Sequence, residues 1–213
     1  MQAPASQATH DRTVAYLKDH SLVVVTAESC TAGLIASRLA GTPGAGGVLE
    51  SAFVVYDPKA KKRSLGVLDE TLREHNLTSE PVALEMARGA LNNSTANLAI
   101  ANTGVADDAD PDVPAGTQCF AWIFLEPTGE RREFAETRKF EGERNEVREA
   151  SADYALDRIA HYHGLARGAL TARRRALTPS PCRRPAGPTA GRRRRPARAA
   201  PPSCRPPRCG RRP

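Results

Sequence analysis

Beyond Gly164 the composition of this 213-residue chain changes abruptly, and that change limits how much of the chain can fold. The stretch after it holds 15 Arg and no acidic residue, Phe, Tyr, Trp or Ile, whereas the part up to Gly164 holds 16 basic and 24 acidic groups, a balance of −8. A Pro- and Arg-rich stretch buries too little apolar surface to offset the entropy lost when its backbone is ordered. The sequence therefore predicts a flexible amino terminus over residues 1–7, one mildly acidic globular domain over residues 8–163, and a disordered tail over residues 164–213.

The predicted tail has two interpretations. Its Arg clusters, Arg173–Arg175 and Arg192–Arg195, would neutralise phosphate groups and give weak, salt-dependent contact with nucleic acid. That interpretation is disfavoured, because the tail has no aromatic side chains on which bases stack. The alternative is out-of-frame readthrough, since GC-rich DNA encodes mainly Arg, Pro, Ala and Gly. In either case we expect the tail to take no part in the main function.

Composition and the amino terminus exclude several classes of protein. No run approaches the roughly 20 apolar residues that a membrane-spanning helix needs, and Met1–His10 has neither the basic start nor the apolar core of a secretory signal. Five Cys in a chain of this length do not make a disulfide framework, and their spacing fits no zinc site. We therefore expect a cytoplasmic protein with reduced thiols, without a metal, a cofactor or a membrane partner.

Short, β-branched apolar runs alternate with helical patterns along the domain. The runs are typical of strands buried in a parallel sheet. Near the carboxyl end, residues 127–129 (PTG) separate two longer strands and predict an antiparallel hairpin. This order predicts an α/β fold, a three-layer α/β sandwich with a mostly parallel sheet and one antiparallel hairpin. The expected strands are Leu22–Thr26, Ala52–Tyr56, Asn97–Asn102, Thr117–Leu125 and Arg131–Phe140, and the expected helices are His10–His20, Thr31–Ala40, one opening at Asp57, one capped by Ser79, and Glu143–Tyr162.

Three polar segments directly follow the three predicted parallel strands. They are residues 26–33 (TAESCTAG), residues 56–61 (YDPKAK) and residues 102–116 (NTGVADDADPDVPAG). Because ligands of open α/β sheets bind beyond the carboxyl ends of the strands, we expect the functional site among these segments.

The first segment has both a chemical and a structural interpretation. Ser29 is a candidate nucleophile or phosphate ligand, and Thr31 is a second hydroxyl at a helix start that favours anions. Spacing alone favours the structural interpretation, in which these hydroxyls cap the helix and Glu28 compensates its dipole. Cys30 is a weaker candidate nucleophile, because no pairing His is evident.

The second segment offers a base. Lys61 would act as one if it were desolvated, and Tyr56 would relay a proton. Lys59 and Lys62 are expected on a solvated helix face.

The third segment combines a glycine with a run of acidic residues. Thr103 and Gly104 end the predicted strand, where glycine lets a ligand approach the backbone. Four acidic residues follow, and they are Asp107, Asp108, Asp110 and Asp112. A divalent cation site is one interpretation, but a solvated acidic loop is favoured because a complete calcium loop is lacking.

Taken together, the chain is similar to the CinA carboxyl-terminal domain family. The resemblance covers residues 8–163 and ends where the predicted tail begins. Its motifs follow here in the family's order: TAESCTAG, FVVYDPKAK with LGV, SEPVALEMARGAL, TGVA, PAGT and FEGERNEVR.

The resemblance implies a nicotinamide mononucleotide amidohydrolase, which hydrolyses the carboxamide to nicotinic acid mononucleotide and ammonia without a metal, in pyridine-nucleotide recycling. It also implies an α/β sandwich that assembles as a dimer or a higher oligomer. The implied catalytic residues, matched by position, are Ser29, Tyr56 and Lys61. The implied substrate-binding residues are Glu28, Thr31, Gly46, Thr103, Gly104 and Arg144.

The chain departs from the family's pattern in three places. Gly46 stands where active relatives commonly carry the serine that is the best candidate nucleophile. Residues 107–110 (DDAD) replace a glycine-rich loop with charges that repel a phosphate, and Ala32 replaces a usual glycine. Two functions therefore stay open. One is an amidohydrolase that uses Ser29, Ser51 or an activated water, and the other is a catalytically impaired homologue that keeps the fold and binds a nucleotide or a protein.

Overall fold

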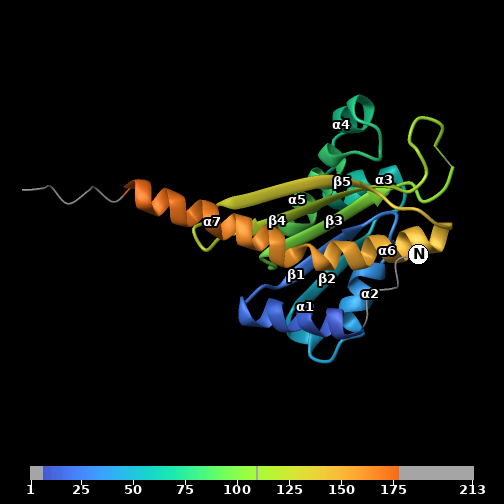
Figure 1. Ribbon diagram of the computed structural model, residues 1–213. Helices are drawn as coiled ribbons and strands as arrows, with labels where there is room; N and C mark the ends of the chain where they lie inside the picture. Colours follow the sequence, from blue (N-terminus) through green and yellow to red (C-terminus); the bar gives the residue numbers. More distant parts are fainter. Residues whose placement is uncertain (1–6, 109, 178–213) are drawn as a thin grey trace, which may run out of the picture. The chain divides into compact units, whose positions relative to one another are not determined.

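The computed structural model describes residues 7–108 and 110–177 of the chain. The strands of this part are β1 (Val24–Glu28), β2 (Leu49–Val54), β3 (Leu98–Gly104), β4 (Thr117–Leu125) and β5 (Arg131–Lys139). They form one sheet in the order β2-β1-β3-β4-β5 (Figure 1). β1 is parallel to both of its neighbours, and the β3–β4 and β4–β5 pairs are antiparallel. The predicted parallel core and antiparallel hairpin are both present, and the sheet that they build is mixed.

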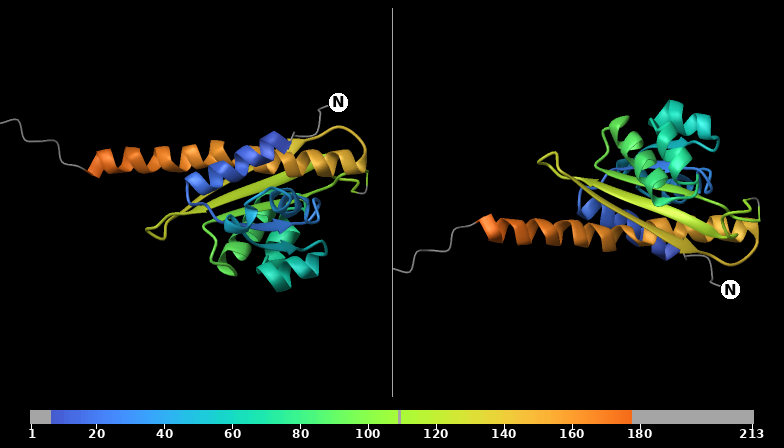
Figure 2. Two further views of the ribbon diagram at one scale, coloured as in Figure 1. Left: turned by 90° about the horizontal axis from the view of Figure 1, so that it is seen from below. Right: turned by 90° about the horizontal axis from the view of Figure 1, so that it is seen from above.

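Helices cover both faces of the sheet, which confirms the three-layer sandwich (Figure 2). One face carries α1 (Gln7–Asp19), α2 (Leu34–Ala40), α6 (Arg144–Asp157) and α7 (Ile159–Leu177). The other face carries α3 (Pro58–Leu65), α4 (Asp69–Glu74) and α5 (Glu80–Asn92), and a short 3₁₀ helix, η1 (Ala45–Gly47), precedes β2. No helix in residues 7–108 and 110–177 is long and apolar enough to cross a membrane.

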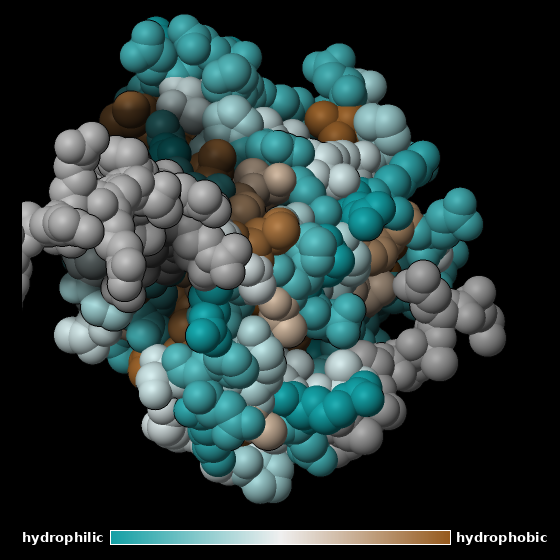
Figure 3. All heavy atoms as spheres, turned by 60° about the vertical axis from the view of Figure 1, so that its left-hand side comes forward, coloured by the Kyte–Doolittle hydropathy of each residue, from teal (hydrophilic) through white to brown (hydrophobic). Residues whose placement is uncertain are grey.

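Alternating side chains of the central strands build a separate core on each face. Val24 of β1 packs in one cluster with Trp122 of β4, and its neighbour Val25 packs in the other with Met86 of α5. Trp122 is fully buried, and its indole donates a hydrogen bond to the Ala155 carbonyl at 3.0 Å. On the face shown in Figure 3, hydrophilic side chains dominate and the apolar ones form small, separate patches.

Several element boundaries differ from the sequence-based expectation for backbone reasons. The helix expected from Thr31 begins only at Leu34, because Ala32 (φ 49°) and Gly33 (φ 94°) both have left-handed backbone conformations. β2 ends at Val54. The two residues after it, Val55 and Tyr56, were expected in the strand, but their carbonyls accept hydrogen bonds from Lys61. The hairpin was predicted almost to the residue, and the short helix α4 was not predicted.

The carboxyl-terminal part of the domain is longer than expected. The closing helix is two helices, which meet at Arg158, and α7 continues to Leu177, so residues 164–177 are helical where a disordered tail was expected. Ala166 explains part of this, since it is fully buried in the core beside α1 and α6, and Ala, Leu and Arg all favour helix. The rest of the predicted tail, including Arg192–Arg195, lies outside the described residues, as do residues 1–6.

Candidate active site

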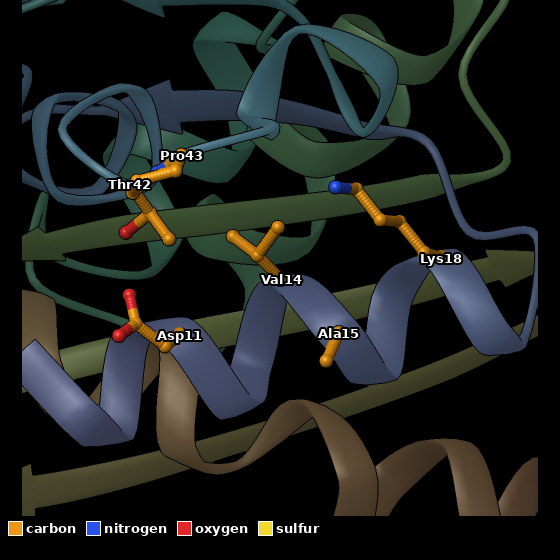
Figure 4. Close-up of a pocket in the computed structure, with 6 residues that line it drawn as sticks. All are labelled: Asp11, Val14, Ala15, Lys18, Thr42 and Pro43. Atoms are coloured by element: carbon orange, nitrogen blue, oxygen red, sulfur yellow. The ribbon is translucent and has the colours of Figure 1, made fainter.

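Among the cavities on the described part of the domain are two that differ in chemistry. The larger has a volume of about 260 Å³ and lies between α1 and the loop after α2, where Asp11 and Lys18 stand at its two ends (Figure 4). The smaller has a volume of about 140 Å³ and lies at the carboxyl ends of β1 and β3. Its lining consists of Ser29, Cys30, Tyr56, Lys61, Leu77, Thr78, Thr103, Gly104, Val105 and Asp110. We take the smaller cavity as the candidate active site, because it combines a hydroxyl and a buried amine.

Ser29 is held at the floor of this cavity by the backbone around it. It is the first residue after β1, and its N–H donates to the Asn102 carbonyl of β3 at 2.9 Å. The chain then reverses through Ala32, whose N–H donates back to the Ser29 carbonyl. The serine is only 7% exposed, so its hydroxyl has few alternative positions.

Lys61 reaches the same point from α3. Asp57 caps this helix by accepting a hydrogen bond from the Lys59 N–H. The Lys61 side chain is almost fully buried, and its Nζ lies 2.8 Å from Ser29 Oγ, 2.9 Å from the Val55 carbonyl and 3.1 Å from the Tyr56 carbonyl. Burial lowers the pKa of Lys61 from 10.5 to about 8, although the charge of Asp57 opposes the shift.

The three contacts of Lys61 suit both of its charge states, because the ammonium form donates to Ser29 Oγ and to the carbonyls of Val55 and Tyr56. A neutral amine has two N–H donors and one lone pair. The carbonyls of Val55 and Tyr56 take both donors, which leaves the lone pair facing the Ser29 hydroxyl. Once Lys61 has lost its proton, the Ser29 hydroxyl donates a hydrogen bond to the amine, which is the arrangement that activates a serine as a nucleophile.

Glu28 and Thr31, both predicted to bind substrate, lie away from the cavity. The Glu28 carboxylate is fully buried and accepts hydrogen bonds from the Thr31 hydroxyl, at 2.8 Å, and from the N–H groups of Gly33, Ile35 and Ala36 at the start of α2. The interpretation in which these residues cap the helix therefore holds for Glu28 and Thr31, because Glu28 accepts hydrogen bonds from the free N–H donors at the start of α2. It does not describe Ser29, which is bound to Lys61 instead.

Thr103 and Gly104 line the cavity as predicted. The Thr103 hydroxyl donates to the Leu77 carbonyl at 2.8 Å, which ties the end of β3 to the segment before α5. Gly104 leaves room for Gln118, because a Cβ at this position would lie 2.4 Å from the Gln118 side-chain oxygen.

Cys30 is buried beside Ser29 and has no base. Gln118 Nε2 lies 3.3 Å from its sulfur, and burial raises the pKa of the thiol. A raised pKa keeps the thiol protonated, and a protonated thiol is a weak nucleophile.

Two residues that hold this loop were missed from the sequence. Gln118 also donates to the Val105 carbonyl, and Arg148 donates to the carbonyls of Cys30 and Thr31. The signal for Gln118 was a polar residue inside an otherwise apolar strand, and the signal for Arg148 was its place at the end of FEGERNEVR.

Arg144 and Tyr56 meet at the mouth of the cavity. Arg144 Nη2 donates to the Tyr56 hydroxyl at 2.8 Å, and Nη1 donates to Asp107 at 2.5 Å. The hydrogen bond and charge of Asp107, together with Tyr56, raise the pKa of Arg144. Tyr56 itself is largely exposed, so its ring forms the outer wall of the cavity.

Gly46 and Ser51 are not brought to this cavity. β1 and β2 are parallel, with Val24 opposite Leu49 and Glu28 opposite Val54. Gly46 precedes the amino end of β2, whereas Ser29 follows the carboxyl end of β1, so about 16 Å of strand separates the two levels. Within one chain, the presence of glycine instead of serine at position 46 therefore removes no side chain from the Ser29–Lys61 site.

Comparison with known proteins identifies the family. The CinA C-terminal domain matches residues 6–163 of this chain. The chain belongs to the CinA C-terminal domain family. Among its relatives, the nicotinamide-nucleotide amidohydrolase PncC of Escherichia coli is 38% identical over 146 residues, which cover 67% of this chain and 86% of PncC. A CinA-like protein of Akkermansia muciniphila is 43% identical over 124 residues, 57% of this chain.

The family's solved structures share the fold. The competence/damage inducible protein CihA of Agrobacterium tumefaciens superposes with a TM-score of 0.67 at 33% identity, covering 76% of this chain and 99% of that one. The CinA-like relatives are longer, and this chain spans 30% of the Akkermansia protein and 36% of a putative competence-damage inducible protein of Symbiobacterium thermophilum. The match therefore concerns one domain of those proteins. At the level of the family, the homologues include hydrolases.

Proposed function

We propose that this domain is a metal-independent amidohydrolase that deamidates nicotinamide mononucleotide to nicotinic acid mononucleotide and ammonia. The observation that carries the proposal is the 2.8 Å contact between Ser29 Oγ and a buried Lys61 whose pKa is lowered to about 8. The name of the E. coli relative supplies the substrate class.

The proposed reaction uses Lys61 as both base and acid. Ser29 Oγ attacks the carboxamide carbon while Lys61 accepts the hydroxyl proton. The carbon–nitrogen bond then breaks, Lys61 returns the proton to the leaving nitrogen, and ammonia departs from an acyl-enzyme. Water, deprotonated by Lys61, hydrolyses the ester and restores Ser29.

The position of Gly46 favours an active enzyme over an impaired homologue. The impaired function rested on the loss of a serine at position 46, but that position lies at the amino end of β2, whereas Lys61 lies at the carboxyl ends of β1 and β2. Ser29 is the hydroxyl in contact with the buried amine, and it is retained.

Ammonia release from nicotinamide mononucleotide by the full chain tests the proposal. We expect Ser29→Ala and Lys61→Ala each to lower kcat by at least about a thousandfold. Cys30→Ala, which changes the neighbouring residue of the same loop, is the matched control and should keep most of the activity. A folded but inactive Cys30→Ala variant would overturn the assignment of roles. A parent chain that is inactive beside an active Gly46→Ser variant would instead support the impaired homologue.

A further inference from the structure

The mouth of the candidate site holds a cation that is already paired. Arg144 contacts Tyr56, which lines the cavity, so it is placed to meet a substrate group that extends out of the pocket. Its other terminal nitrogen is bound to Asp107 Oδ2 at 2.5 Å. An anionic group of a substrate therefore competes with a carboxylate of the chain itself.

Asp107 is placed to act on the cavity as well as on Arg144. The charges of Arg144 and Asp107 both reach the Cys30 thiol in the cavity lining, with opposite effects on its pKa. The second oxygen of Asp107, Oδ1, is buried and has no hydrogen-bond partner among the described residues. Such an oxygen accepts a hydrogen bond from a hydroxyl or an amide, and it repels a phosphate.

A further acidic group adds to this effect. Asp110 lines the cavity directly, and its carboxylate accepts a hydrogen bond from Asn76 at 3.3 Å. Asp110 therefore places a second carboxylate beside the cavity, in addition to the Asp107 carboxylate that pairs with Arg144. A phosphate entering this site must displace Asp107 or lie beside two carboxylates.

We infer that Asp107 is a specificity-determining residue, which removes the preference of the site for a phosphorylated substrate by occupying Arg144. The inference rests on the proposed amidohydrolase function and defines its substrate class. The substrates are pyridinium carboxamide ribosides, with the phosphate contributing little to recognition. The side chains of Asp107 and Arg144 are each close to half exposed, so solvent screens the pair and its effect is about tenfold rather than larger.

The test compares nicotinamide mononucleotide with its dephosphorylated nucleoside, nicotinamide riboside, in the full chain. For the parent we expect the two kcat/KM values to agree within about threefold. Asp107→Asn should raise the ratio of nucleotide to nucleoside about tenfold, mainly through a lower KM for the nucleotide. Asp108→Asn is the matched control, because it removes the same charge from an exposed neighbour, and it should leave the ratio unchanged.

A binding measurement separates this inference from the proposed function. Calorimetric Kd values for the same two ligands are measured on Ser29→Ala and on the Ser29→Ala/Asp107→Asn double variant, which do not turn over. If the Kd ratio shifts about tenfold while the parent releases no ammonia, the inference stands and the proposed function fails. If ammonia is released but neither ratio shifts, the inference fails and the function stands. An equal shift in Asp108→Asn, a parent with a strong preference for the nucleotide, or no binding of either ligand also overturns it.

Discussion

At the scale of single residues, the site depends on how one lysine is desolvated. Lys61 is buried to 2% exposure, yet each of its hydrogen-bonding positions has a partner. The two carbonyls come from the two residues that follow β2, and the hydroxyl comes from the residue that follows β1. Burial without a carboxylate in hydrogen-bonding contact lowers the pKa of an amine, and this is the condition for a lysine base.

The pH dependence of the reaction should reflect the pKa of Lys61. Its pKa in the folded chain is about 8, below the ordinary 10.5, so the amine becomes the neutral base as the pH rises through about 8. We expect kcat/KM for ammonia release to rise with pH, to be half-maximal near that value, and to level off above it. A profile that is flat or that falls across this range would contradict Lys61 as the base. Circular dichroism at each pH checks that the fold is unchanged.

Ala32 is a residue in an unfavourable backbone conformation. Its φ of 49° is left-handed, its side chain is exposed, and most L-residues lose about 1–2 kcal/mol in this region. Ala32→Gly should therefore raise the free energy of unfolding by about 1 kcal/mol, measured by urea denaturation. Ala36→Gly, inside α2, is the control and should lower it by a similar amount. A loss of stability in Ala32→Gly would show that the turn is not strained.

At the scale of elements, the start of α2 is completed by β1. The helix has no capping side chain at Gly33, and Glu28 from the strand accepts its free N–H groups instead. Since α2 has only seven residues, it depends on this contact and on the packing of Ile35 and Leu39. The same contact fixes the loop that carries Ser29.

Replacing Glu28 should lower the stability of the domain rather than weaken substrate binding. Glu28→Gln keeps the shape, but its NH2 group cannot accept the hydrogen bonds made to one carboxylate oxygen, and the others lose a charged acceptor. We expect a loss of about 2–3 kcal/mol in the free energy of unfolding. Glu74→Gln, at an exposed position near the end of α4, should change it by less than about 0.5 kcal/mol. Urea denaturation of both variants measures this. A stable Glu28→Gln variant with a raised KM would restore the predicted substrate-binding role.

At the scale of the whole domain, α7 completes the helical layer that it forms with α1, α2 and α6 on one face of the sheet. Tyr162 stacks on Trp122 with ring centroids 4.5 Å apart, and Tyr16 of α1 contacts His163 through a 2.9 Å hydrogen bond. Ala166, one turn later, is fully buried. The folded domain therefore extends past residue 163, where the family match ends.

A chain that ends at Gly164 should be less stable than one that ends at Leu177. The shorter chain loses the buried Ala166 and shortens α7 to its first turns, at a cost of about 1 kcal/mol. We expect its melting temperature to be about 2–4 °C lower. Equal melting temperatures would mean that residues 165–177 add nothing to the fold.

The sequence by itself determined the elements and the family. The β4–β5 hairpin, the Asp57 cap of α3 and the position of Thr103 and Gly104 at a strand end all follow from local patterns, because strand and helix periods and turn residues act over a few positions. The motifs of the sequence also named three segments whose residues line the same cavity.

Only the tertiary structure decided which polar side chains meet. Ser29 and Lys61 are 32 positions apart, and their contact depends on the parallel register of β1 and β2. The same register places Gly46 at the opposite end of the parallel strands, and the packing of α2 turns Glu28 inward, although both had been assigned to the substrate. The direction of a side chain at a strand end depends on what packs against that face, and this is a property of distant residues that no local pattern contains.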